Sequence, residues 1–334
     1  FSYPALSAAR VRPLIDKADA TFEAVAALLG IEGGAPIDVD LSGTTENHAG
    51  TAYLDRIRMQ VNDDSATATL AHETAHVFAM RLSGGARGHQ LDNMMVLNEG
   101  LAEWVEGKLG KQAGATGGVT QAQELAAAIV SARRLVTPRH LTDQAAFAGA
   151  VDEHLKYPLG AILIERLVQR YGPAAPKTLL LAMASEDFPR DLEGYALWQT
   201  AFQLARFDLD LVLDDYARHL KQLESKYAHQ IAKLPRPRGS LVERDDGYAI
   251  ALRFDLPLPE NATPLVRFRP GKISDASSYR TGYGGLSKAG TYTVEVPEDM
   301  VTRSEVCFQP GVVRDGLIMY EPWVCLPVDA ASAD

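Results

Sequence analysis

His72-Glu73-Thr74-Ala75-His76 lies inside the apolar run of residues 66–82, and this short stretch determines how the rest of the chain is interpreted. Residues i and i+4 lie one above the other on a helical face, so His72 and His76 can direct two imidazoles at one point. Zinc takes such nitrogen ligands in a tetrahedral array. Glu73 lies one position round the helix, where it can take a proton from a metal-bound water. The pattern predicts a zinc-binding helix over residues 66–82.

A third protein ligand is needed, because a catalytic zinc site uses three protein ligands and a water. The candidates downstream are His89, Asp92, Glu99 and Glu103. Residues 77–98 leave room for a helix end, a loop and a returning helix over about 96–109. Glu99 and Glu103 share one face of that second helix. One carboxylate can bind the metal, and the other can accept the free ring N–H of a ligand histidine.

The two motifs together resemble the gluzincin clan of zinc metallopeptidases. The second, Asn98-Glu99-Gly100-Leu101-Ala102-Glu103, is closest to the aminopeptidase-N family and to bacterial peptidase-MA-like proteins. The resemblance implies one Zn²⁺ ion bound by His72, His76 and Glu99, with Glu73 as the general base. It gives Glu103 the place of an Asp that supports the first histidine in thermolysin-like members. The fold it implies is an α+β peptidase domain with a small sheet and a mainly helical second lobe.

Two further segments carry a weaker resemblance. Residues 157–172 are similar to the helix after the active site in these peptidases. Pro158 suits a first helical turn, so Tyr157 is expected at the helix cap, where its phenol could donate a hydrogen bond to an oxyanion. An ordinary half-buried tyrosine is the alternative, and His154 competes for the same role. Gly43-Thr44-Thr45-Glu46-Asn47 is similar to an amine-binding string of the aminopeptidases, but it lacks their methionine and also fits a plain turn.

Composition and periodicity divide the chain. Apolar spacing predicts a helix over residues 4–29, strands over 36–41 and 51–61 (the second with a bulge), and helices from 121 to about 232. Proline and glycine then indicate a linker, and short β-like runs follow. The expected organisation is a gluzincin-like zinc peptidase domain over residues 1–234, a linker over 235–240 and a β-sandwich-like accessory domain over 241–334.

The only two cysteines are Cys307 and Cys325. Their spacing matches neither C-x-x-C nor a zinc knuckle, but a metal or redox pair, a disulfide between two strands and two unpaired thiols all stay open. A disulfide would indicate an oxidising compartment. The chain begins at Phe1, without a methionine or a signal peptide, as a mature secreted or periplasmic protein would. The expected location is therefore extracytoplasmic.

Charge and hydropathy exclude two classes of partner. The formal net charge of −10 argues against a nucleic-acid binder, which needs a basic face. The sequence contains no run of 18 or more apolar residues, so no segment is long and apolar enough to span a membrane.

The predicted function is hydrolysis of a peptide or protein substrate by a zinc-bound water that Glu73 activates. The alternatives are a zinc-binding interaction protein without turnover and a zinc hydrolase of a non-peptide amide or ester. An intact Glu73 favours an enzyme, because a structural site needs no base.

Overall fold

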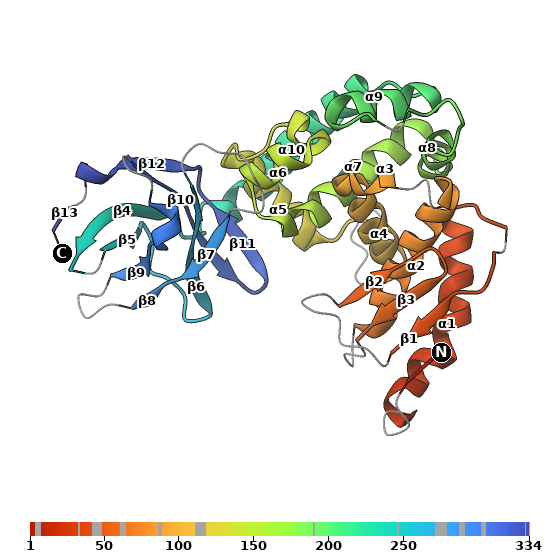
Figure 1. Cartoon of the computed structure of the whole chain (residues 1–334), viewed down its shortest axis with the longest axis horizontal. Helices are drawn as coiled ribbons and strands as arrows, with labels where there is room; N and C mark the ends of the chain where they lie inside the picture. The colour runs from red at the N-terminus through yellow and green to blue at the C-terminus, as the bar shows by residue number, and fades with distance from the viewer. Residues whose placement is uncertain are drawn as a thin grey trace. The chain divides into compact units, whose positions relative to one another are not determined.

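The chain is described by a computed structural model that mixes helices and small sheets (Figure 1). The structure describes residues 1–3, 8–32, 34–41, 49–60, 65–85, 89–110, 118–189, 191–245, 247–270, 279–286, 291–301, 305–330 and 332–333. The chain forms two compact units. Unit 1 comprises residues 1–124, 141–144 and 154–218, and unit 2 comprises residues 125–140, 145–153 and 219–334.

A three-stranded sheet and two helices form one side of unit 1. Its strands β1 (Asp38–Asp40), β3 (Arg56–Met59) and β2 (Gly50–Ala52) lie in that order, with β1 parallel and β2 antiparallel to β3. Helices α1 (Ala8–Leu28) and α2 (Ala66–Leu82) pack on this sheet through a shared apolar core. That core contains Val11, Leu14, Ala18, Val39, Ile57, Met59, Leu70 and Val77.

One strand expected from the sequence is two strands. The alternation over residues 51–61 was interpreted as a single strand with a bulge, and that prediction is wrong. Residues 53–55 turn the chain, and β2 and β3 pair as an antiparallel hairpin with Ala52 opposite Ile57. A reversal between two half-buried strands shifts the apolar phase, as a bulge does, so the two cannot be told apart by periodicity. The hairpin leaves β2 at an edge of the sheet.

Helix α2 has the bounds that the sequence predicted. Its residues are buried on most sides, Glu73 and Thr74 included. Gly84 and Gly85 follow it with positive φ angles of 100° and 65°, a conformation that glycine adopts without steric cost. The chain then forms a short helix α3 (His89–Asp92) and α4 (Met95–Leu109), the expected returning helix.

Helix α4 crosses α7 (Lys156–Tyr171) at two glycines. A Cβ added to Gly100 would lie 2.2 Å from the carbonyl carbon of Gly160, and one added to Gly160 would lie 2.2 Å from the carbonyl oxygen of Val96. The two backbones can approach this closely only because neither position carries a side chain. Helices α8 (Ala175–Met183) and α9 (Gly194–Leu204) follow in unit 1, and α10 (Leu209–Ile231) contributes to both units.

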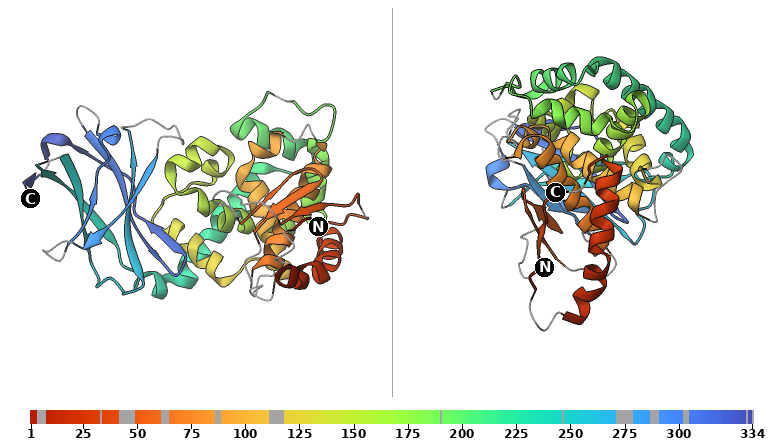
Figure 2. Two further views of the ribbon diagram at one scale, coloured as in Figure 1. Left: turned by 60° about the horizontal axis from the view of Figure 1, so that its bottom comes forward. Right: turned by 90° about the vertical axis from the view of Figure 1, so that its right-hand side faces the viewer.

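Unit 2 contains two five-stranded sheets (Figure 2). One pairs β11 (Leu317–Tyr320), β10 (Glu305–Arg314), β6 (Ala262–Arg269) and β7 (Arg280–Tyr283) in that order, with β12 (Val324–Pro327) also on β10. The other has the order β13 (Ser332–Ala333), β4 (Pro237–Arg244), β5 (Gly247–Phe254), β9 (Tyr292–Glu295) and β8 (Gly285–Leu286). Residues of both sheets, such as Ile250 and Phe308, share one apolar core, as the layers of a sandwich do.

Unit 2 also includes helices that the sequence had assigned to the peptidase domain. They are α5 (Gln121–Ala132), most of which lies in unit 2, and α6 (Gln144–Ala150). Ile129 of α5 packs with Val312 and Met319 of the sheet. Residues 237–240, expected to be linker, begin strand β4 and pair with β5. The division into residues 1–234, 235–240 and 241–334 stays a prediction about domain organisation.

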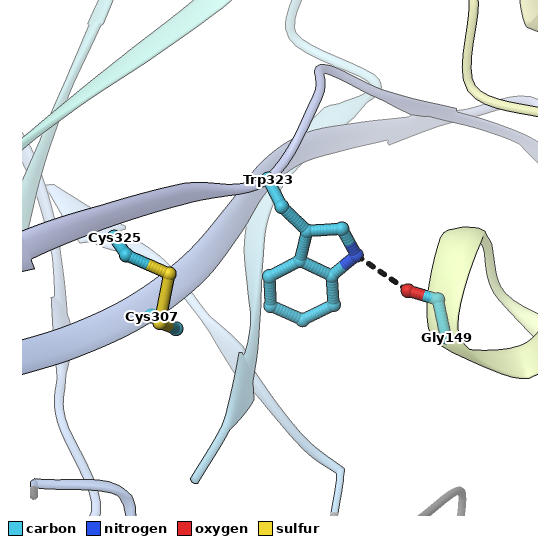
Figure 3. The surroundings of a disulfide bond; sticks show 4 residues. All are labelled: Gly149, Cys307, Trp323 and Cys325. Carbon is cyan, nitrogen blue, oxygen red and sulfur yellow. Dashed lines mark hydrogen bonds between the residues drawn. A yellow bond between two sulfur atoms is a disulfide. The ribbon is translucent and has the colours of Figure 1, made fainter. Parts of the chain in front are cut away.

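Cys307 and Cys325 form a disulfide between β10 and β12, where they lie directly opposite each other (Figure 3). The sequence left a metal or redox pair, a disulfide and two unpaired thiols open, and the structure shows the disulfide. Glu305 lies near the two sulfur atoms, but bonded cysteines offer no thiolate to a metal. Within the described residues, no helix is both long and apolar enough to cross a membrane.

The glycine crossing leads to a stability prediction. Gly100→Ala would force α4 away from α7, and such overpacking typically lowers the free energy of unfolding by about 1–3 kcal/mol. The better helix propensity of alanine, worth about 1 kcal/mol, offsets part of this loss. We expect a lower urea midpoint for Gly100→Ala and for Gly160→Ala. Gly34→Ala is the control, because its added Cβ would meet its nearest atoms at 3.5 Å, an ordinary contact. Equal midpoints for all three variants would contradict the assigned role of the crossing.

Candidate metal centre

A cavity of about 550 Å³ in unit 1 collects most of the residues that the sequence singled out. Its walls come from the edge strand β2, from α2 and α4, and from the first turn of α7. The polar residues that line it are Thr51, Thr69, His72, Glu73, His76, Asp92, Asn98, Glu99, Glu103, Glu106, Lys156 and Tyr157. Five of these are carboxylates, so the cavity favours a positively charged occupant.

The two motif histidines converge on one carboxylate oxygen. Nε2 of His76 lies 3.2 Å from Oε2 of Glu99, and Nε2 of His72 lies 3.5 Å from the same oxygen. The ligand atoms of the three residues all lie within 4.8 Å of one another. Helix α2 supplies both imidazoles from one face, and α4 brings Glu99 to them.

The spacing of these atoms suits a zinc ion. A tetrahedral site with metal–ligand distances of about 2.0–2.1 Å separates its ligand atoms by about 3.3 Å. The distances of 3.2 and 3.5 Å from Glu99 lie on either side of that value. Two nitrogens and one oxygen are also the donor set of catalytic zinc sites of the His₂Glu type. The residues present therefore fit the metal on both geometry and chemistry.

The other nitrogen of each ring faces an acceptor. Nδ1 of His76 lies 3.1 Å from Oδ1 of Asn98. Nδ1 of His72 lies 3.3 Å from Oε2 of Glu106 and 3.7 Å from Oε2 of Glu103. Hydrogen bonds of this kind hold a ring in one tautomer and leave Nε2 free for a metal. The sequence proposed Glu103 for this support, and the structure puts Glu106 nearer to His72.

The charges of the cavity shift the pKa values of its groups. Burial lowers the pKa of His72, but hydrogen bonds with Glu106 and Glu99 and the nearby carboxylates outweigh it and raise this pKa to about 10. Burial opposes the charge on Glu99, yet the two histidines and Lys156 hold its pKa far below the usual range. Burial and repulsion by Glu106 raise the pKa of Glu103. Positive charge is thus strongly favoured beside Glu99.

Glu73 lies on the wall of the same cavity without belonging to the three-residue ligand group. It is only 6% exposed, and its carboxylate packs against Gly50 of β2. A Cβ at Gly50 would lie 2.5 Å from Oε1 of Glu73, so only glycine lets the edge strand pass so close to this side chain. The strand and the carboxylate therefore meet at one point of the cavity wall.

The first turn of α7 closes another side of the cavity. Tyr157 lies within this turn rather than at the cap, because the helix already begins at Lys156. Its ring centroid is 5.9 Å from that of His72. Nζ of Lys156 lies 3.2 Å from Oε1 of Glu99, whereas the two histidines approach Oε2 of the same carboxylate. His154 is exposed and is not among the residues that line the cavity.

The remaining sequence candidates are placed as follows. Asp92 lines the cavity but is not part of the converging ligand group. The side chain of His89 and the whole of Gly43–Asn47 lie outside the described residues. Sequence reasoning missed Lys156 and Glu106. Glu106 shares a face with Glu99 and Glu103 by helical spacing, which was a usable signal, whereas nothing local marks Lys156.

Comparisons with known proteins add a few distant structures. No protein-family model matches the chain, and no curated protein matches it at a significant level. The chain is similar to the M60 catalytic domain with the CBM51-1 and CBM51-2 domains of Clostridium perfringens ZmpB, at 12% identity and a TM-score of 0.36, over 91% of this chain and 33% of that one. It is also similar to the M60 catalytic domain of ZmpC from the same organism, in complex with the sialyl T antigen, at 11% identity and a TM-score of 0.34, over 92% of this chain and 62% of that one.

A further structure of the ZmpB metallopeptidase from Clostridium perfringens is 11% identical, with a TM-score of 0.33, and covers 93% of this chain and 62% of that one. The chain thus spans about a third of the first solved structure and less than two thirds of the other two. Likeness at this identity and TM-score assigns no activity to the chain.

The ligand group leads to a metal prediction. We expect about one zinc ion per purified chain, and Glu99→Gln should release it on dialysis because one of three ligands loses its charge. Glu106→Gln removes only a carboxylate that faces Nδ1 of His72, so it should weaken zinc affinity by about 10–100-fold without abolishing it. Elemental analysis and a competition assay with a chelator would measure both effects. Full zinc content in Glu99→Gln would contradict the ligand assignment.

Proposed function

We propose that the protein is a zinc-dependent peptide hydrolase, with His72, His76 and Glu99 as the ligands of one Zn²⁺ ion. The single observation that carries the proposal is the convergence of both Nε2 atoms on one oxygen of Glu99, with Glu73 in the same cavity. A structural zinc site is closed by four protein ligands. A group of three ligands beside a buried carboxylate supports a catalytic site instead.

Zinc bound there would act as a Lewis acid, which lowers the pKa of a water and polarises a carbonyl group. In this proposal, Glu73 takes the proton of the attacking water and later passes it to the leaving amine. Its low exposure, next to Gly50, keeps competing water away from the carboxylate. Its position outside the ligand group suits a base rather than a metal ligand.

Tyr157 is the proposed oxyanion donor. It lines the cavity close to the ring of His72, whereas His154, the competing residue, is not part of the lining. Tyr157 also lies in the first turn of α7, and the backbone N–H groups at a helix N-terminus favour negative charge. A phenol at this place can donate a hydrogen bond to the negative oxygen of a tetrahedral intermediate.

The edge strand β2 supports a peptide as the substrate. Residues 49–52 line the cavity, and within the described residues β2 pairs only with β3. Its other edge can therefore accept the main chain of an extended peptide as an added strand. Non-peptide esters and amides lack the repeated N–H and C=O groups that such pairing uses. The disulfide also agrees with an extracytoplasmic location, which stays part of the proposal.

The role of Glu73 can be tested by Glu73→Gln, which keeps the shape of the side chain and removes the base. Zinc content should stay near wild type, while cleavage of a quenched peptide library should fall by about 10²–10⁴. Glu165→Gln is a matched control, because Glu165 is a buried glutamate of unit 1 that pairs with Trp104 outside the cavity. It should retain activity. Unchanged cleavage by zinc-loaded Glu73→Gln would refute the mechanism.

A second substitution, Tyr157→Phe, tests the oxyanion donor. Loss of one such donor typically lowers kcat by about 10²–10³. We expect that loss with unchanged zinc content and little change in KM, because the hydrogen bond forms mainly in the transition state. Tyr171→Phe, at the far end of the same helix, should leave kcat unchanged. If the two variants had the same kcat, Tyr157 would be an ordinary half-buried tyrosine.

A further inference from the structure

Unit 2 contains a second cavity, of about 350 Å³, that the peptidase proposal does not use. It lies where α6 and the 3₁₀-helix over residues 138–142 meet β6, β10 and the segment before β12. Its lining residues are Arg134, Leu135, His140, Ala145, Ala146, Gly149, Ala150, Arg269, Gln309, Pro322 and Trp323. The volume is at the lower end of the range for small-molecule sites.

The charge of this cavity is opposite to that of the zinc site. Arg134 and Arg269 line it together with His140, and none of its described lining residues is acidic. The Nε atom of Arg269 is buried and has no hydrogen-bond partner in the described part of the chain. In a protein with a net charge of −10, a cavity lined by two arginines and by no carboxylate of the described residues is a local exception that needs a physical reason.

A third arginine lies directly behind the cavity wall. Arg267 is 4% exposed, and its described hydrogen bonds go to neutral oxygens, those of Gln309 and of the Ala148 backbone. Its guanidinium lies 5.6 Å from the ring centroid of Trp323, and that of Arg269 lies 4.5 Å from the same ring. The guanidinium of Arg267 also lies 4.6 Å from the ring centroid of Tyr279. Aromatic rings stabilise these cations only in part.

Buried charge without a counter-ion is costly, because water no longer solvates it. Arg267 and Arg269 both lie near one indole ring, so their positive charges also repel each other. A negatively charged group in the cavity would compensate both effects. A guanidinium matches a carboxylate best, since its planar N–H groups can donate two parallel hydrogen bonds.

The walls of the cavity are held in place before any ligand arrives. The indole N–H of Trp323 donates to the carbonyl oxygen of Gly149 at 2.7 Å (Figure 3). Gln309 is fully buried and donates to the carbonyl oxygen of Ala150 at 2.9 Å. The Cys307–Cys325 disulfide lies two residues before Gln309 and two after Trp323, and it joins β10, which carries Gln309, to β12, which directly follows Trp323. Such preorganisation lowers the entropy cost of binding.

We propose that this cavity binds a small ligand that has one carboxylate and an apolar body. Arg269, with Arg134 at the mouth, would bind the carboxylate. Leu135, Ala145 and Pro322 would contact the apolar part. All of these residues belong to unit 2 and none lines the zinc site, so the proposal does not depend on the peptidase function.

Benzoate and benzamide are suitable probes, because they have the same size and ring and differ mainly in charge. Isothermal titration of the full chain should show benzoate binding with one site per chain. Benzamide should bind at least about tenfold more weakly, as expected when a hydrogen bond between charged groups is lost. Inorganic phosphate, which lacks an apolar body, should also bind more weakly than benzoate. Equal affinity for benzamide would refute recognition of the charge, and tighter phosphate binding would refute the apolar part.

Three arginine-to-glutamine variants test whether benzoate binds in this cavity. Arg269→Gln should weaken benzoate binding at least about tenfold. Arg134→Gln, at an exposed position, should also weaken benzoate binding. Arg253→Gln, an exposed change on β5 outside the cavity, should have no effect. Thermal unfolding and circular dichroism would verify that each variant folds. No benzoate binding by the wild type, or equal affinity in Arg134→Gln and Arg253→Gln, would overturn the proposal.

Discussion

The close approach of α4 and α7 is the constraint on which the candidate metal centre depends. Gly100 stands next to Glu99, and Gly160 stands one turn after Lys156, so one backbone contact fixes the distance between the Glu99 carboxylate and the first turn of α7. A side chain at either glycine would separate the helices and move Glu99 relative to Lys156, which lies 3.2 Å from its second oxygen. The glycine of the N-E-G motif therefore has a packing reason as well as its place beside the proposed ligand Glu99.

Electrostatics explains why this arrangement suits a cation. Glu73, Glu99, Glu103 and Glu106 line one cavity, and burial together with repulsion by Glu106 raises the pKa of Glu103. Lys156 and the two histidines offset part of the repulsion. A divalent ion would offset more of it at one point, where two Nε2 atoms already converge on Glu99. The cluster is thus less costly with a metal than without one.

Local sequence patterns predicted the parts of the site that lie within one helix. The bounds of α2 were predictable because its apolar run ends at two glycines, and the i, i+4 rule placed His72 with His76 and Glu99 with Glu103. The rest depends on tertiary packing. The hairpin of β2 and β3 has the same period as one bulged strand, and residues 237–240 form a strand because β5 offers partners. Lys156 reaches Glu99 only through the crossing of α4 and α7.

The arginine-lined cavity shows the same limit more strongly. Arg134, Arg269, Gln309 and Trp323 come from distant parts of the chain, and no spacing connects them. Their proximity follows from the pairing of β10 with β6 and β12, which no local signal specifies. What links the two cavities is the physical rule that buried charges of one sign need a partner of the other. Five carboxylates line the candidate metal centre, and arginines without a described carboxylate partner mark the second cavity. The sign of the uncompensated charge therefore predicts the class of ligand in each case, a metal cation in the first and a carboxylate in the second.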